Sequence, residues 1–159
     1  MENEIHEIEK KIFSTFAEVA SSIGYSPLHG QIIGVLLVKG KVLSLQEIAR
    51  ETGYSSGMIS LSLDLLEVLG VVKKIKKTAD RKLYVELSGD LLECLKNAIT
   101  LKLSKSISSS LTEFEGEKKK LEKIPGTESE RVLETIQTLE NEIKRLRSYV
   151  DLLSKAGLP

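Results

Sequence analysis

The feature that most constrains this fold is a pair of short helical segments, residues 45–52 and 56–69, separated by a three-residue turn. Ser44 stands directly before the first segment and Glu47 three positions later, which is the spacing of a capping box. Gly53 suits the left-handed residue that ends a helix. Two short helices with such a turn between them predict a helix-turn-helix.

The period of the sequence changes directly after the second helical segment. Residues 71–77 are β-branched and charged, and residues 81–87 alternate between apolar and polar side chains, so both segments predict strands. Thr78, Ala79 and Asp80 between them are typical of a turn. The order of helix, helix, strand and strand predicts a winged helix, in which the hairpin is the wing.

Positive charge is concentrated in this hairpin. The whole chain has 23 Lys and Arg against 23 Asp and Glu, a formal net charge of zero. Residues 71–85 nevertheless hold five Lys and one Arg against Asp80, a local net charge of +5, whereas residues 1–27 hold two Lys and five Glu, a net charge of −3. A basic segment in a neutral chain indicates a local anionic partner.

The winged helix predicts DNA contacts from its second helix and its wing, because the second helix of a helix-turn-helix enters the major groove. Serine hydroxyls can bond phosphates or base edges, and Leu61 and Met58 can touch a thymine methyl group. From the turn and the helix we expect contacts by Ser55, Ser56, Gly57, Met58, Ser60, Leu61 and Ser62. From the wing we expect contacts by Lys76, Lys77, Asp80, Arg81 and Lys82. Because segment 56–69 holds no Arg or Lys, it cannot make the common Arg–guanine pair, so most of the affinity is expected from the wing.

Long helices are expected on both sides of the winged helix. We divide the chain into an N-terminal helix (residues 1–24), a winged-helix domain (25–88) and a C-terminal helical region (89–159), in which Thr127 and Glu130 predict a capping box. A heptad pattern in the last helix comprises Ile136, Leu139, Ile143, Leu146, Val150 and Leu153. β-branched residues at a with Leu at d favour a parallel two-stranded coiled coil, so we expect these residues to join two copies of the chain. Packing of this helix within its own chain is the alternative. The expected fold is mostly α, a winged helix-turn-helix with long N- and C-terminal dimerisation helices.

Several other classes of protein lack their sequence signals here. Gly53–Gly57 spells G-x-S-x-G, but a nucleophile elbow needs a strand before it, and a capped helix precedes it in this chain. Cys94 is the single cysteine, which excludes an internal disulfide and a multi-cysteine metal site and fits a reducing cytoplasm. No apolar run approaches the ~18 residues that span a membrane. We therefore expect a cytoplasmic protein that is not an enzyme, with no cofactor, no metal and no membrane association.

Five short motifs lie within residues 25–88. They are Leu45-Gln46-Glu47-Ile48-Ala49, Ser55-Ser56-Gly57-Met58-Ile59-Ser60, Leu66-Glu67, Leu69-Gly70-Val71-Val72, and Asp80-Arg81-Lys82 with Tyr84. These motifs resemble the GbsR/MarR-type winged-helix transcriptional regulators. The resemblance implies a homodimer that binds pseudo-palindromic double-stranded operator DNA as a repressor, with the N- and C-terminal helices building the dimer interface. The family often has Lys or Asn at the positions of Ser56, Met58 and Ser62, and Arg at the position of Asp64.

The same resemblance implies a small-molecule effector between the DNA-binding domain and the dimerisation helices. Phe13, Phe16, Tyr25 and His29 lie near that expected junction, where simple core packing is the alternative. The rival function for the whole chain is a winged-helix adaptor that binds another protein and does not bind DNA.

Overall fold

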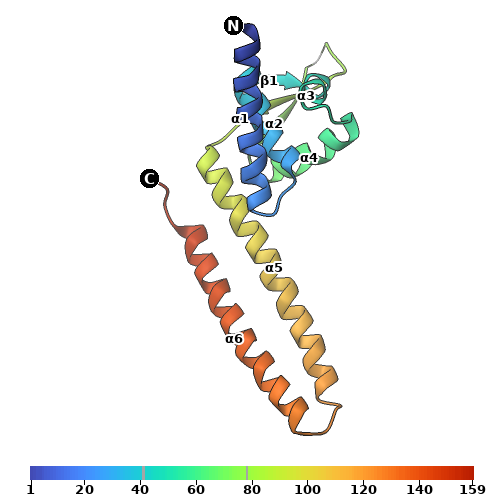
Figure 1. Ribbon diagram of the computed structural model, residues 1–159, viewed down its shortest axis with the longest axis vertical. Coiled ribbons are helices and arrows are strands. Elements are labelled where there is room, and N and C mark those ends of the chain that lie inside the picture. Colours follow the sequence, from blue (N-terminus) through green and yellow to red (C-terminus); the bar gives the residue numbers. More distant parts are fainter. Residues whose placement is uncertain (41, 78) are drawn as a thin grey trace. The chain divides into compact units, whose positions relative to one another are not determined.

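The computed structural model describes residues 1–40, 42–77 and 79–159 and divides into two compact units, Met1–Leu95 and Lys96–Pro159 (Figure 1). The boundary between the units lies inside α5 (Leu91–Leu121), later than the division at residue 88 expected from the sequence. Among the described residues, no helix combines the length and the hydropathy that a membrane span requires.

The first unit begins with two helices that cross closely, α1 (Glu2–Ser22) and α2 (Pro27–Lys39). Ser26 caps α2, since its side-chain oxygen accepts a hydrogen bond from the Leu28 N–H at 3.3 Å. The crossing is close because residue 30 is glycine: a Cβ built there would lie 2.0 Å from the backbone oxygen of Phe16 in α1. The core of this unit is centred on α2, where the side chains of Ile32, Val35 and Leu36 are completely buried.

The predicted helix-turn-helix is confirmed as α3 (Leu45–Thr52) and α4 (Ser56–Val68). The capping box at the start of α3 is formed: the Ser44 hydroxyl accepts from the Glu47 N–H at 3.1 Å, and a Glu47 carboxylate oxygen accepts from the Ser44 N–H at 2.7 Å. That second hydrogen bond lowers the pKa of Glu47 below its usual value. Gly53 ends α3 with a positive φ of 75°, a conformation that glycine adopts without steric cost.

The wing is part of a three-stranded antiparallel sheet with the order β1-β3-β2. Strands β2 (Val72–Lys76) and β3 (Leu83–Leu87) are the predicted hairpin. Strand β1 (Val42–Ser44) was not expected from the sequence, and it pairs with the other side of β3. The alternating segment of the sequence thus forms the middle strand, β3, and its Val85 is fully buried. Thr78, which belongs to the predicted turn, lies outside the described residues.

The second unit is a helical hairpin of α5 and α6 (Thr127–Lys155), which run antiparallel along each other (Figure 1). Lysines of α5 reach the other arm of the hairpin: Lys96 Nζ donates to the backbone oxygen of Ala156, directly after α6, at 3.3 Å, and Lys118 Nζ donates to Glu140 at 3.1 Å. The capping box expected at Thr127 is not formed, because Gly126 occupies the N-cap position and offers no side chain. The fold is thus mostly α, with a small sheet, as the sequence predicted.

Candidate nucleic-acid interface

Helix α4 buries one face and exposes the other. Ile59, Leu63 and Leu66 are buried, and they hold α4 against the rest of the first unit. The exposed face carries Ser56, Gly57, Met58, Leu61 and Asp64, and Ser60 is half-buried beside them. Five of the predicted DNA-contacting residues of this helix therefore reach the surface fully or in part, together with Ser55 in the turn.

The predicted DNA contact by Ser62 is not supported by the structure. The side chain of Ser62 is only 6 % exposed, so it faces the interior and not the surface where DNA would lie. The reason is helical geometry: Ser62 stands three positions after Ile59 and four before Leu66, which places all three residues on the same buried stripe.

The start of α4 leaves room for a bulky anion. The Ser55 hydroxyl accepts a hydrogen bond from the Met58 N–H at 3.3 Å and so acts as the N-cap. A Cβ built at Gly57 would meet no atom closer than the Ser55 hydroxyl oxygen at 4.0 Å. Because residue 57 has no side chain, a phosphate can approach the free N–H groups of the first turn, where the helix dipole also favours negative charge.

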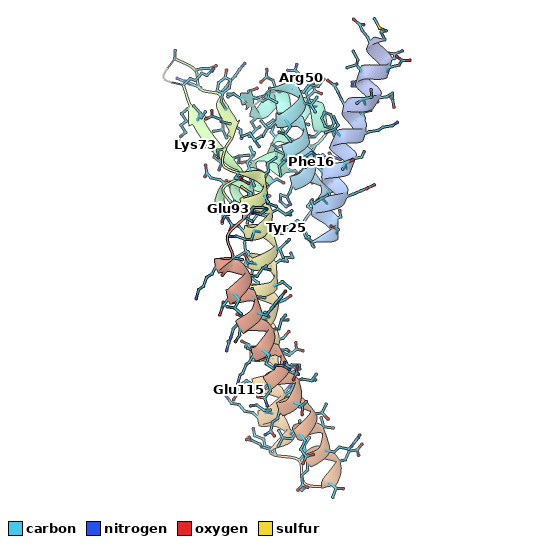
Figure 2. The ribbon with its side chains drawn as sticks, turned by 90° about the vertical axis from the view of Figure 1, so that its left-hand side faces the viewer. Phe16, Tyr25, Arg50, Lys73, Glu93 and Glu115 are labelled. Atoms are coloured by element: carbon cyan, nitrogen blue, oxygen red, sulfur yellow. The ribbon has the colours of Figure 1, made fainter. Side chains whose placement is uncertain are left out.

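The wing exposes most of its positive charge. Exposed Lys and Arg side chains extend from β2, β3 and the connection between them, at Lys73, Lys76, Lys77, Arg81 and Lys82. Lys73 is labelled in Figure 2, where it lies on the hairpin side of the first unit. Long flexible cations of this kind suit phosphate contacts, which position a protein on DNA without reading its sequence.

Asp80, one of the predicted wing contacts, is used inside the wing itself. One carboxylate oxygen accepts from the Lys82 N–H at 3.1 Å, and the other accepts from the Tyr84 hydroxyl at 2.8 Å. Both hydrogen bonds favour the charged form, so the pKa of Asp80 lies below its usual value. The Lys77 ammonium lies over the Tyr84 ring, 4.1 Å from its centroid. Asp80 thus joins the backbone of Lys82 to the side chain of Tyr84, whose ring in turn contacts Lys77.

The sequence analysis did not predict an ion-pair cluster that lies between α4 and the wing. Lys74 on β2 pairs through its ammonium with Asp64 on α4 and lies 3.9 Å from Glu67. The Glu67 carboxylate also accepts from the Lys74 backbone N–H at 3.2 Å. The hydrogen bond to Asp64 raises the pKa of Lys74 above its usual value. The sequence held one indication of this cluster. Asp64 and Glu67 are three residues apart, so they share one side of the helix, and the strand that follows is rich in lysine.

The residues expected near an effector site pack in the first unit. Phe13 is buried, and Phe16 lies between α1 and α2 (Figure 2). A Cβ built at Gly34 of α2 would lie 3.2 Å from the Phe13 ring and 3.6 Å from the Phe16 ring. The Tyr25 and His29 rings meet edge to face with centroids 6.1 Å apart, and burial raises the pKa of Tyr25. Phe13 and Phe16 thus pack against α2, whereas Tyr25 and His29 are half-buried at the connection from α1 to α2.

The heptad of α6 is divided between two environments within the second unit. At the a positions, Ile136 and Val150 are buried and Ile143 is half-buried. At the d positions, Leu139 and Leu146 are exposed, with 44 % and 42 % of their surface accessible, and Leu153 is also exposed. The a positions therefore contribute to the packing of the hairpin, while the d positions form an open apolar stripe along it.

No protein-family model matches the sequence, and no curated protein matches it significantly. A solved structure described as a transcriptional regulator is similar over 92 % of this chain and 96 % of its own, with a TM-score of 0.64 and 19 % identity.

Two further solved structures show a weaker likeness. A transcriptional regulator from Thermotoga maritima is 16 % identical with a TM-score of 0.43, over 92 % of this chain and 96 % of its own. A mutant of MarR from E. coli complexed with operator DNA is 14 % identical with a TM-score of 0.41, over 60 % of this chain and 66 % of its own. Together with the elements described above, the likeness at a TM-score of 0.64 shows that this chain has the winged-helix fold of a solved transcriptional regulator.

Proposed function

We propose that this protein is a transcriptional regulator of the GbsR/MarR type that binds double-stranded DNA as a homodimer and acts as a repressor. The observation that carries the proposal is the juxtaposition of α4 and the wing. A helix with an open N-terminal turn lies beside a hairpin that exposes five cations, and the Lys74–Asp64 pair ties the two elements together. A duplex matches both elements, because α4 fits a major groove and the wing cations suit the flanking phosphates.

Binding should depend steeply on salt. Each phosphate that a cation neutralises contributes about −0.9 to the slope of log K against log salt concentration. Replacing Lys76, Lys77 and Arg81 by alanine removes three cations from each copy, or six from a dimer. If all six contact phosphates, the slope becomes shallower by about 5.

The test measures binding of a labelled random-sequence duplex by fluorescence anisotropy over a series of salt concentrations. The matched control replaces Lys105, Lys119 and Lys123 by alanine. These lysines are exposed in the second unit, and their replacement removes the same charge as the wing variant does. We expect the wing variant to lose slope and the control to keep it. A wild-type protein that leaves the duplex free at micromolar concentration and low salt would contradict DNA binding and favour the protein-binding adaptor. An unchanged slope in the wing variant would remove the wing from the interface.

The homodimer is proposed to form through the exposed d positions of α6, with the N-terminal helix as a second contributor. Leu139, Leu146 and Leu153 offer an apolar stripe that a second copy would cover. Leu146→Glu places a charge on this stripe and should yield a monomer in light scattering, whereas the wild type should have twice the mass of one chain. Gln137→Glu adds the same charge at an exposed position away from the stripe and should leave the dimer intact. A dimeric Leu146→Glu variant would refute this interface.

A further inference from the structure

The outward face of α4 carries an unusual set of side chains for a helix proposed to enter the major groove. Gly57, Leu61, Asp64 and Val68 follow one another at steps of four, three and four, which places them on a single stripe. Leu61 is 73 % exposed and Val68 is 77 % exposed. Leu61 lies in the middle of the stripe, whereas Val68 is the last residue of the helix.

The carboxylate on this stripe is paired with a cation of the wing. Asp64 lies one turn beyond Leu61, and the ammonium of Lys74 on β2 pairs with it while also lying 3.9 Å from Glu67. The side chain of Asp64 stays 59 % exposed while it is paired. The stripe therefore presents apolar side chains beside a carboxylate that keeps free acceptor capacity and whose charge is partly offset by Lys74.

The four base pairs differ in what they offer such a surface. Guanine presents two acceptors, N7 and O6, which need donors such as Arg or Lys. Helix α4 contains no Arg, Lys, Asn, Gln or His, so it cannot make the bidentate contacts that select guanine or adenine. A thymine methyl group suits an exposed leucine, and the exocyclic amino group of adenine or cytosine suits a carboxylate. Only an A·T pair offers both the methyl group and the amino group.

Resting on the proposed function, we propose that Leu61 is a specificity-determining residue that contacts a thymine methyl group, so that the protein selects A·T pairs opposite the middle of α4. The adjacent carboxylate of Asp64 supports the same choice by accepting from the amino group of that pair. Affinity then comes mainly from the wing, and base preference comes from a nonpolar contact. The serines at the start of α4 remain available to the phosphates that flank these bases.

The test removes the methyl group from the DNA and keeps the protein unchanged. Two duplexes of equal length are compared by fluorescence anisotropy at low salt, one of alternating A·T pairs and one in which every thymine is replaced by uracil. We expect the wild type to bind the uracil duplex about fourfold more weakly for each methyl group contacted, which corresponds to the burial of one methyl group. Leu61→Ala should bind the two duplexes with more similar affinities than the wild type does. Val68→Ala is the control, since it removes an equally exposed apolar side chain from the end of the helix and should keep the wild-type ratio.

The outcomes separate the two proposals. Wild-type protein that binds both duplexes with the same affinity would overturn the role of Leu61 and leave the proposed function standing, as would a Leu61→Ala variant that keeps the wild-type ratio. An equal affinity is also the result expected if the exposed face of α4 serves a protein partner. Wild-type protein that binds neither duplex would contradict the proposed function itself.

Discussion

Replacing Gly30 by alanine would push a methyl group into the backbone of the neighbouring helix. The added Cβ would lie 2.0 Å from the Phe16 backbone oxygen, 2.3 Å from the Phe16 carbonyl carbon and 2.7 Å from the Ala17 nitrogen. Favourable contacts between carbon atoms lie at about 3.5–4.0 Å, so helix α1 would have to move away from α2 by more than an ångström. No side chain can turn aside to relieve the clash, because the three nearest atoms are all backbone.

Two opposing effects set the change in the free energy of unfolding that Gly30→Ala should cause. Overpacking a well-packed core typically costs about 1–3 kcal/mol, and a clash with rigid backbone belongs at the upper end of that range. Alanine in place of glycine in a helix returns about 1 kcal/mol through its better helix propensity. We therefore expect Gly30→Ala to lower the free energy of unfolding of the first unit by about 2 kcal/mol.

The assay is urea unfolding followed by circular dichroism, with amide hydrogen exchange of α2 to assign the change to the first unit. The matched control is Gly57→Ala. Gly57 is a helical glycine of the same unit, and a Cβ added there would lie 4.0 Å from its nearest neighbouring atom. The control should be at least as stable as the wild type. A Gly30→Ala variant with wild-type stability would show that α1 and α2 do not cross as closely as described, and the reasoning would fail.

Three further predictions concern single side chains. Ser44→Ala removes the side-chain half of the capping box and should cost about 1 kcal/mol in urea unfolding. The pKa of Asp80 lies below its ordinary value of 3.8, so the wing should keep the stabilisation from this carboxylate above about pH 4 and lose it as the pH falls further. The amide resonances of Lys82 and Tyr84 in an NMR titration would report the loss. Asp80→Asn should abolish the pH dependence. Cys94 is buried and its thiol pKa is raised, chiefly by burial, so iodoacetamide at pH 8 should modify it much more slowly in the folded protein than in urea. Equal rates would show that the thiol is accessible.

The local signals of the sequence determined the helix-turn-helix. The capping box of Ser44 and Glu47 and the left-handed Gly53 formed as predicted, and Ser55 caps α4 in the same local way. Each of them depends on atoms at most three or four residues apart, which is why the sequence alone specifies them. The alternation in residues 83–87 identified β3 for a similar reason, since the period of a strand is visible within five residues.

Tertiary structure decided what depends on distant partners. Strand β1 is only three residues long and exists because β3 offers it an open edge. The pairing of Lys74 with Asp64 requires the hairpin to fold back onto α4, ten residues earlier in the chain. Ser62 is buried because the elements packed on α4 cover this serine as well as the apolar residues Ile59, Leu63 and Leu66.

The heptad of α6 shows the same division most clearly. Its period predicts a helix with one apolar face, and the helix formed as Thr127–Lys155. A period cannot specify which surface covers that face, because a neighbouring helix of the same chain and a helix of a second copy bury apolar side chains equally well. Only the folded hairpin shows that Ile136 and Val150 are buried within the chain and that Leu139 and Leu146 are left at the surface.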